Sequence, residues 1–173
     1  MRNKEIHQLK TIEKRLLWLS CWMIHNANHL RENTDGLKVG GHQASCASMV
    51  SIMTALYFHI LKPEDRVAVK PHASPVFHAI QYLMGNQSRE KLENFRGFGG
   101  AQSYPSRTKD IDDVDFSTGS VGLGVAITAK SIIYCRNPWG PSLCGGRPPP
   151  APPCCLLEVL CESLNVSQEG IWR

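Results

Sequence analysis

Residues Arg66-Val67-Ala68-Val69-Lys70-Pro71-His72-Ala73-Ser74-Pro75 decide the predicted fold of this chain of 173 residues. The first four form a short apolar run between polar residues, which predicts a buried strand. A helix is expected next, at residues 75–83, and a strand that leads into a helix begins a βαβ unit. We therefore expect an α/β domain in which a parallel sheet is flanked by helices.

Apolar periodicity predicts further helices around this strand. Near the start, four residues at steps of four, three and four form the stripe of an amphipathic helix from Thr11 onward: Ile12, Leu16, Leu19 and Met23. Small and apolar residues over 43–61 indicate a second, more fully buried helix. A third helix is expected from Ser88, as its cap, to Phe95, followed by a glycine-rich loop at residues 97–100.

The composition changes near residue 131. The segment 135–173 contains seven of the eleven prolines and five of the seven cysteines, a composition that favours extended, solvated chain over a packed core. We expect a partial domain at residues 1–134 and a largely disordered tail at residues 135–173. Our hypothesis for the change is a frameshift or a premature end to the coding sequence.

Charge and cysteine spacing argue against several classes of protein. A net charge of +4, scattered along the chain, indicates neither a nucleic-acid partner nor an anionic membrane. The apolar stretch at residues 16–24 is too short to span a bilayer, and it does not fit a signal peptide, so we expect a cytoplasmic protein. No Cys-x-x-Cys occurs, and an odd number of cysteines favours free thiols.

Three loops at predicted element ends carry the densest chemical pattern. They are residues 40–45 (GGHQAS), 70–75 (KPHASP) and 118–124 (TGSVGLG). Helix starts offer unpaired N–H groups, glycine allows close approach of the backbone, and histidine can carry a proton near neutral pH. Together the loops predict a site that binds an anion and handles protons, although each loop taken singly fits a purely structural role at least as well.

Two other patterns are poor metal sites. The acidic run from Asp110 to Asp115 lacks the glycine and glutamate that a calcium loop needs, which favours a solvated loop. His25 and His29 lie one helical turn apart, but no Glu-x-x-His arrangement accompanies them, so packing or substrate-side polarity is the favoured role. We therefore predict no metal ligands in this sequence.

Four segments taken in order resemble transketolases and the homodimeric decarboxylating component of pyruvate dehydrogenase complexes. They are GGHQASCASM, DRVAVKPHASPVFHA, LENFRGFGGAQSYPS and DFSTGSVGLGVAIT, and the resemblance covers residues 24–129. It implies a partial thiamine-diphosphate-binding fold, with thiamine diphosphate and Mg²⁺ as cofactors and a 2-oxoacid or ketose as substrate. Full-length members of this family act as homodimers that hold the cofactor between two domains.

The resemblance also implies roles for single residues. His42 matches a histidine that faces the substrate and the thiazolium ring, and His72 matches one near the diphosphate. Tyr104 matches a substrate-side tyrosine, and its Ser-Tyr-Pro segment sides with 2-oxoacid decarboxylation, although Ser106 stands where that branch usually has a histidine. The remaining matched residues are those of the cofactor-binding turn and the helix after it: Gly119, Ser120, Val121, Gly122 and Gly124.

Several parts of the family's site are missing from this sequence. The family binds Mg²⁺ through an Asp in a Gly-Asp-Gly/Ala segment and a downstream Asn, and it activates the cofactor with a Glu from a separate domain; none of these is found here. The resemblance therefore implies a fragment that is inactive alone. The alternative is a non-catalytic interaction module that retains half of the fold and offers its proline-rich tail to a partner.

Overall fold

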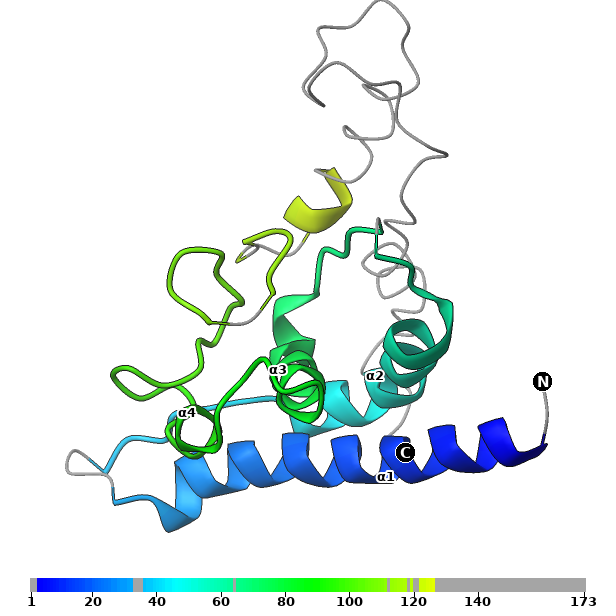
Figure 1. Cartoon of the computed structure of the whole chain (residues 1–173). Helices are drawn as coiled ribbons and strands as arrows, with labels where there is room; N and C mark the ends of the chain where they lie inside the picture. Colours follow the sequence, from blue (N-terminus) through cyan, green and yellow to red (C-terminus); the bar gives the residue numbers. More distant parts are fainter. Residues whose placement is uncertain are drawn as a thin grey trace, which may run out of the picture.

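The computed structural model describes residues 3–32, 36–63, 65–111, 113–117, 119 and 122–126. The long helix α1 (Asn3–His25) runs along one side, and α2 (Gln43–Ala55) and α3 (Ser74–Leu83) pack against it and against each other (Figure 1). A short 3-10 turn, η3 (Pro71–Ala73), precedes α3, and α4 (Arg89–Glu93) follows it. The three longer helices therefore enclose the core.

The predicted stripe of α1 faces this core. Leu16 and Met23 are fully buried, and Ile12 and Leu19 pack against them while partly exposed. The helix begins at Asn3, before the expected start at Thr11, and its first turns carry exposed side chains of good helix formers. The apolar stripe thus identifies the buried face of the helix, whereas its start lies in a polar segment that contributes little to the core.

α1 and α2 both end in a wider, π-helical turn. η1 (Asn26–Leu30) continues α1, and η2 (Leu56–Ile60) continues α2, each closed by a hydrogen bond that spans five residues. The two segments of α2 and η2 cover residues 43–60, as predicted for the second helix. Its burial is less complete than expected, because Ala44 and Ala47 are exposed while Cys46, Met49 and Val50 are buried.

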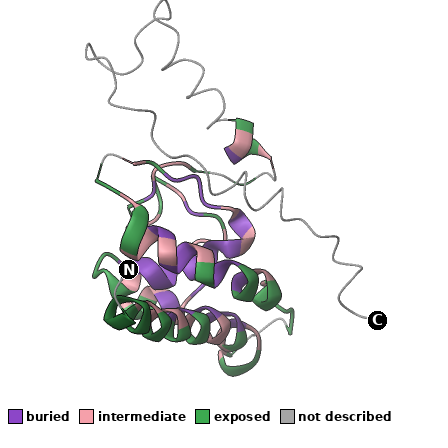
Figure 2. Ribbon diagram, turned by 90° about the vertical axis from the view of Figure 1, so that its right-hand side faces the viewer, coloured by how far each residue is buried: buried purple, intermediate pink, exposed green. Residues whose placement is uncertain are grey.

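α3 is the most buried helix of the described part. It spans Ser74–Leu83, which confirms the helix predicted at 75–83, and every residue from Ser74 to Gln81 is buried. Figure 2 shows the buried residues gathered between the helices, with exposed residues along the outer side. α4 is capped by Ser88, whose Oγ accepts a hydrogen bond from the Lys91 N–H, as predicted, but the helix ends at Glu93 rather than Phe95.

The predicted parallel sheet is wrong for the described part of the chain, which is helical and contains no strand. Residues 66–69 are an irregular segment, although Val67, Ala68 and Val69 are buried as a central strand would be. A strand requires a neighbour that accepts and donates ladder hydrogen bonds, and within the described ranges none lies beside this segment. The apolar run therefore predicted the burial of these residues correctly, but it predicted their pairing in a sheet incorrectly.

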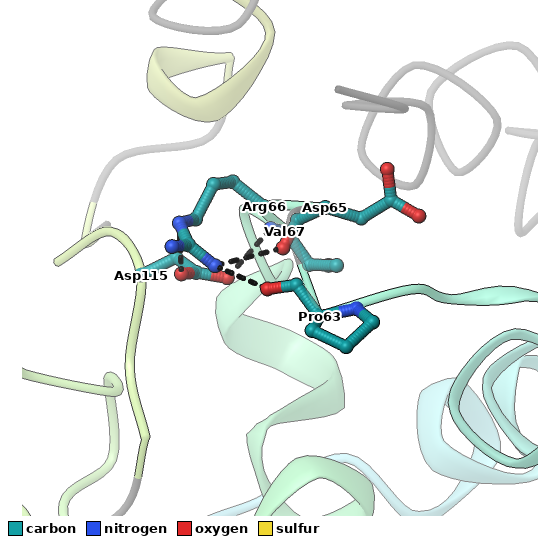
Figure 3. A network of polar contacts seen from close by, with 5 residues as sticks. All are labelled: Pro63, Asp65, Arg66, Val67 and Asp115. Atoms are coloured by element: carbon teal, nitrogen blue, oxygen red, sulfur yellow. Dashed lines mark hydrogen bonds and ion pairs between the residues drawn. The ribbon is translucent and has the colours of Figure 1, made fainter. Parts of the chain in front are cut away.

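A carboxylate takes the place of a neighbouring strand at this segment. The N–H of Val67 donates to Asp115 Oδ2 at 2.8 Å, and Arg66 Nε lies 3.4 Å from Asp115 Oδ1 (Figure 3). The Arg66 guanidinium also donates to the carbonyl oxygens of Pro63 and Asp65. Burial raises the pKa of Asp115, while the Val67 N–H and Arg66 act in the opposite direction.

Two predictions fall outside the described residues. The tail at 135–173 and the end of the predicted domain, at residues 127–134, belong to the part of the chain of which the structure gives no account. Among the helices that are described, none combines the length and the apolar composition needed to cross a membrane.

Candidate functional site

His42 lies at the start of α2, directly after two glycines. It occupies the N-cap position with φ −124° and ψ 86°, and its side chain is exposed. Gly40 and Gly41 both have positive φ, at 80° and 127°. A Cβ at Gly41 would approach the side chain of Ile24 in α1 to 2.9 Å, so glycine is needed here both for the backbone conformation and for the close approach to α1.

His72 comes from the predicted loop before α3 and meets His42 edge to face. The two imidazole centroids are 4.7 Å apart, with an angle of 76° between the ring planes. His72 lies in η3, where Pro71 sets the first residue of the turn and the Ala73 N–H donates to the Lys70 carbonyl at 2.9 Å. Two predicted histidines, 30 positions apart in the sequence, thus form one cluster.

The charges that act on His72 are cationic. Burial lowers the pKa of His72 below its usual 6.5, and the neighbouring His42, Lys70 and Arg96 lower it further, in that order. A neutral His72 can accept a proton at neutral pH. Because basic side chains from three segments act on His72, the cluster favours an anion as its ligand.

Cys46 supports the cluster from inside the core. It lies one helical turn after His42, and its Sγ donates to the His72 carbonyl oxygen at 3.7 Å. Burial raises the pKa of the Cys46 thiol to about 12, and the nearby Cys21 raises it as well. Cys46 is therefore a packing residue in its thiol form, which joins α2 to the turn that carries His72.

Tyr104 and Gly119, which were predicted separately as site residues, lie near each other. The Tyr104 side chain is half exposed, and a Cβ added at Gly119 would lie 3.9 Å from its Cδ2 atom. The hydrogen bond from Ser74 Oγ to the Ser103 carbonyl, at 2.7 Å, connects the segment of Tyr104 to the segment of His72. Among the described aromatic rings, however, Tyr104 contacts neither His42 nor His72.

The rest of the predicted glycine turn is described only in part. Ser120 and Val121 lie outside the described residues. Gly122 has φ +87°, a conformation that favours glycine, and Gly124 is buried in a helical turn at 123–126, closed by the Ala126 N–H and the Gly122 carbonyl. The prediction that Gly122 and Gly124 open a helix agrees with this turn, whereas their contact with a cofactor stays a prediction.

Sequence reasoning missed Arg96 and Asn28 as parts of this site. Arg96 acts on His72, and Asn28 bonds to the backbone of Gly40. Neither residue lies in the three predicted loops, and neither has a spacing that relates it to a histidine. Only the fold, which places residues 28, 40 and 96 side by side, connects them.

The second histidine pair, His25 and His29, differs from the first. Its ring centroids are 4.9 Å apart, and both side chains are exposed on the end of α1 and on η1. Within the described ranges no group of three or more His, Cys, Asp or Glu side chains could hold a metal ion. This pair therefore serves as an internal comparison for the His42–His72 pair.

An open groove of the described part lies away from the histidine pair. It has a volume of about 310 Å³, runs between α1, α3 and α4 and is lined by aromatic residues that include Trp18, Trp22 and Tyr82. At its edge, Arg89 Nε and Glu93 Oε1 form an ion pair at 2.6 Å. None of the predicted site residues lines this groove.

Comparison with known proteins shows similarity to one class of enzyme over part of the chain. The chain is 31% identical over 118 residues to the pyruvate dehydrogenase E1 component of Mycobacterium tuberculosis, and 33% identical over 120 residues to that of Escherichia coli K12. A third relative, the E1 component of Buchnera aphidicola from Acyrthosiphon pisum, is 30% identical over 141 residues. The chain is similar to part of the pyruvate dehydrogenase E1 component.

This similarity to the E1 component has a defined extent. It covers 62% of this chain in the first two cases and 74% in the third, but the matched part spans only 12% to 15% of the length of these relatives. No protein-family model matches the chain. The similarity confirms the expected resemblance to pyruvate dehydrogenase over part of the chain, and the transketolase alternative stays a prediction.

Proposed function

We propose that this chain is a fragment of a thiamine-diphosphate-dependent 2-oxoacid dehydrogenase of the pyruvate dehydrogenase E1 type, in which His42 and His72 face the cofactor. The observation that carries the proposal is the edge contact between these two imidazoles, 4.7 Å between centroids. The names of the relatives support the enzyme class. We favour a 2-oxoacid over a ketose because the Ser103-Tyr104-Pro105 segment resembles the dehydrogenase branch.

The donor set of the histidine cluster fits the diphosphate group of the cofactor. His72, Lys70 and Arg96 can each donate a hydrogen bond, and the charges of Lys70 and Arg96 both act to lower the pKa of His72. Such groups attract a phosphate oxygen. His72 and Lys70 are the residues that we propose would hold the diphosphate.

The same residues do not fit Mg²⁺. This ion prefers oxygen ligands, above all carboxylates, and the cluster offers imidazole, ammonium and guanidinium groups. No group of carboxylates or histidines suited to a metal occurs among the residues that the structure describes, and the sequence has no Gly-Asp-Gly segment. We therefore assign no step of the proposed chemistry to a metal held by this chain.

When bound, thiamine diphosphate supplies a nucleophilic carbon that attacks a carbonyl group. His72, whose pKa is lowered, would accept a proton at its imidazole nitrogen, and the exposed His42 beside it would donate a hydrogen bond to a developing oxyanion. Tyr104 and the turn at Gly119 would contribute to the substrate side and the cofactor side, as the resemblance implies. We propose that the chain alone does not turn over substrate, because it lacks the family's metal-binding and activating residues.

The homodimeric state and the cytoplasmic location also remain proposals taken from the resemblance and the sequence.

The alternative function, a non-catalytic interaction module, differs from the main proposal in one measurable property. An interaction module has no reason to bind thiamine diphosphate, whereas a fragment that retains the histidine cluster does.

Calorimetric titration of the full chain tests the proposal, with thiamine diphosphate and with inorganic pyrophosphate as probes, each with and without Mg²⁺. We expect saturable binding of both probes, weakened about tenfold by His72→Asn, which is the loss expected for one charge-assisted hydrogen bond. His29→Asn is the matched control, because His29 belongs to the other histidine pair, and it should leave binding unchanged. Absence of binding at millimolar probe, or equal loss in both variants, would contradict the proposal.

A further inference from the structure

Arg96 has an unusual backbone conformation. Its φ is +61°, and it is the non-glycine residue of the described part with positive φ. Residues with a Cβ rarely adopt this region, and they do so where the surrounding structure holds them. Here the Arg96 N–H donates to the Ala101 carbonyl at 2.9 Å, which closes the glycine-rich loop behind it. The fold therefore fixes the direction in which the Arg96 side chain leaves the backbone.

The guanidinium group of Arg96 is held on two sides. Its central carbon lies 5.4 Å from the centroid of the Phe95 ring, which is fully buried, and one terminal nitrogen donates to the Val39 carbonyl at 2.8 Å. The Nε–H is buried and has no hydrogen-bond partner among the described residues. Because a buried donor without a partner is unfavourable, the position of this side chain is imposed by its contacts with Phe95 and Val39.

The contact with Val39 brings Arg96 onto the turn that leads to His42. A Cβ at Gly40 would lie 3.0 Å from the same terminal nitrogen of Arg96, so the guanidinium rests directly against this glycine. On another side, the side chain of Asn28 bonds to the N–H and the carbonyl of Gly40. His42 follows two residues later. The turn at residues 39–41 is thus held between α1 and the glycine-rich loop.

We propose that Arg96 is a positioning residue for His42: by fixing the turn at residues 39–41, its guanidinium sets the edge contact between His42 and His72. The proposal rests on the proposed function insofar as the histidine pair is the site of that function. The role of Arg96 goes beyond the proposed function, because Arg96 lies outside the predicted loops.

Arg96 can influence the histidines in two ways, and these can be separated. Its charge contributes, after burial and together with His42 and Lys70, to the low pKa of His72. Its planar group also fixes the turn through Val39 and Gly40. Arg96→Lys retains the charge but loses the planar fork, whereas Arg96→Gln loses both.

The test is a double-mutant cycle on the pKa of His72, measured by NMR titration of the full chain without ligand. In the wild type, His42→Asn should raise the pKa of His72, because it removes a neighbouring group that repels the protonated form. In the Arg96→Lys and Arg96→Gln backgrounds, we expect this effect of His42→Asn to fall by half or more, since the rings no longer meet.

Arg31→Gln is the matched control. The Arg31 guanidinium donates to the Phe95 carbonyl at 2.9 Å and to Asn94 Oδ1 at 3.2 Å, so it holds the backbone next to Arg96 rather than the turn before His42. In this background the effect of His42→Asn on the pKa of His72 should be retained. If residues 94–96 had only a structural role, the effect of His42→Asn on the pKa of His72 would be reduced equally in the Arg96 and Arg31 variants.

A second variant keeps the test decisive if Arg96→Gln fails to fold. Gly40→Ala retains Arg96, but its Cβ would lie 3.0 Å from the terminal nitrogen of Arg96 and its backbone would be strained at φ +80°. It should therefore disturb the same turn and reduce the coupling between the histidines in the same way. The proposal is overturned if the coupling is unchanged in Arg96→Lys and Gly40→Ala, or if Arg31→Gln reduces it equally. Because no ligand is added, failure to bind thiamine diphosphate leaves this result unaffected, and the two proposals can fail separately.

Discussion

The side-chain amide of Asn28 forms two hydrogen bonds with the backbone of Gly40. Its Nδ2 donates to the Gly40 carbonyl at 2.9 Å, and its Oδ1 accepts from the Gly40 N–H at 3.0 Å. The same Nδ2 also donates to the Ile24 carbonyl at 2.7 Å. Asn28 lies in η1, so the wider turn at the end of α1 carries the amide that holds the approach to His42.

Asn28→Ala should destabilise the chain by about 1–2 kcal/mol, because it removes both bonds to Gly40 together with the bond to the Ile24 carbonyl. Urea unfolding followed by circular dichroism measures this. Gln8→Ala, an exposed change on α1, is the control and should stay within about 0.5 kcal/mol of the wild type. Equal effects of the two substitutions would show that the pairing with Gly40 does not contribute to stability.

The lowered pKa of His72 predicts a pH dependence of stability. The unfolded chain, with a pKa near 6.5, binds a proton before the folded chain does as the pH falls. Stability contributed by His72 is therefore present above the unfolded pKa and is lost as the pH falls through it. Relative to His72→Gln, the wild type should lose free energy of unfolding between about pH 7.5 and about pH 5.5.

Urea titrations at these two pH values check this sign. His29→Gln is the comparison, since it removes an exposed histidine outside the cluster. An increase in the stability of the wild type relative to His72→Gln on acidification would mean that the cluster favours the protonated imidazole, contrary to the expectation.

The thiol of Cys46 should react slowly with alkylating agents. Its pKa, raised from 9.0 to about 12 by burial, lowers the thiolate fraction near neutral pH by about a thousandfold. Iodoacetamide treatment of the native chain, followed by peptide mass spectrometry, should modify Cys21 well before Cys46, because Cys21 is partly exposed. In urea both should react at similar rates, and rapid native modification of Cys46 would contradict its burial.

Asp115→Ala should cost about 1–3 kcal/mol, because it leaves the buried N–H of Val67 without its acceptor. Asp115→Asn retains an acceptor oxygen and should cost less. Arg66→Gln removes the ion pair and the exposed bonds of the guanidinium to the carbonyls of Pro63 and Asp65. Since the Arg66 side chain is 53% exposed, its effect should be about 0–1 kcal/mol. Urea unfolding of the three variants decides, and an Arg66→Gln effect as large as that of Asp115→Ala would contradict the prediction.

Gly100 and Gly99 should differ sharply in their tolerance of alanine. A Cβ at Gly100 would overlap the backbone carbonyl of Asn94, which already accepts a hydrogen bond from the Gly97 N–H. We expect Gly100→Ala to cost about 3 kcal/mol or more. Gly99 has φ +74° but open space around it, so Gly99→Ala should cost only about 1–2 kcal/mol. Thermal unfolding of both variants is the measurement, and equal losses would contradict it.

Local sequence predicted the helices more accurately than it predicted how the segments between them pair. The stripe of α1, the length of α3 and the Ser88 cap could be anticipated because helix hydrogen bonds and caps are formed within a few residues. The sheet could not be predicted in the same way, because burial of Val67 and Val69 does not distinguish a strand from an irregular buried segment. Pairing depends on what lies beside that segment, and there the described chain places the Asp115 carboxylate.

Local patterns were enough to predict the loops of the candidate site and their residue types, because His42 and His72 each come directly after a glycine or a proline at the start of a helical segment. The meeting of these two rings, and the bonds by which Asn28 and Arg96 hold the turn before His42, depend on how the chain folds. The physical reason is distance along the chain. The contacts of Gly40 with Asn28 and Arg96, and of His42 with His72, join segments that are far apart in the sequence. The packing of α1, α2 and α3 against one another brings these segments together, and no local pattern encodes it.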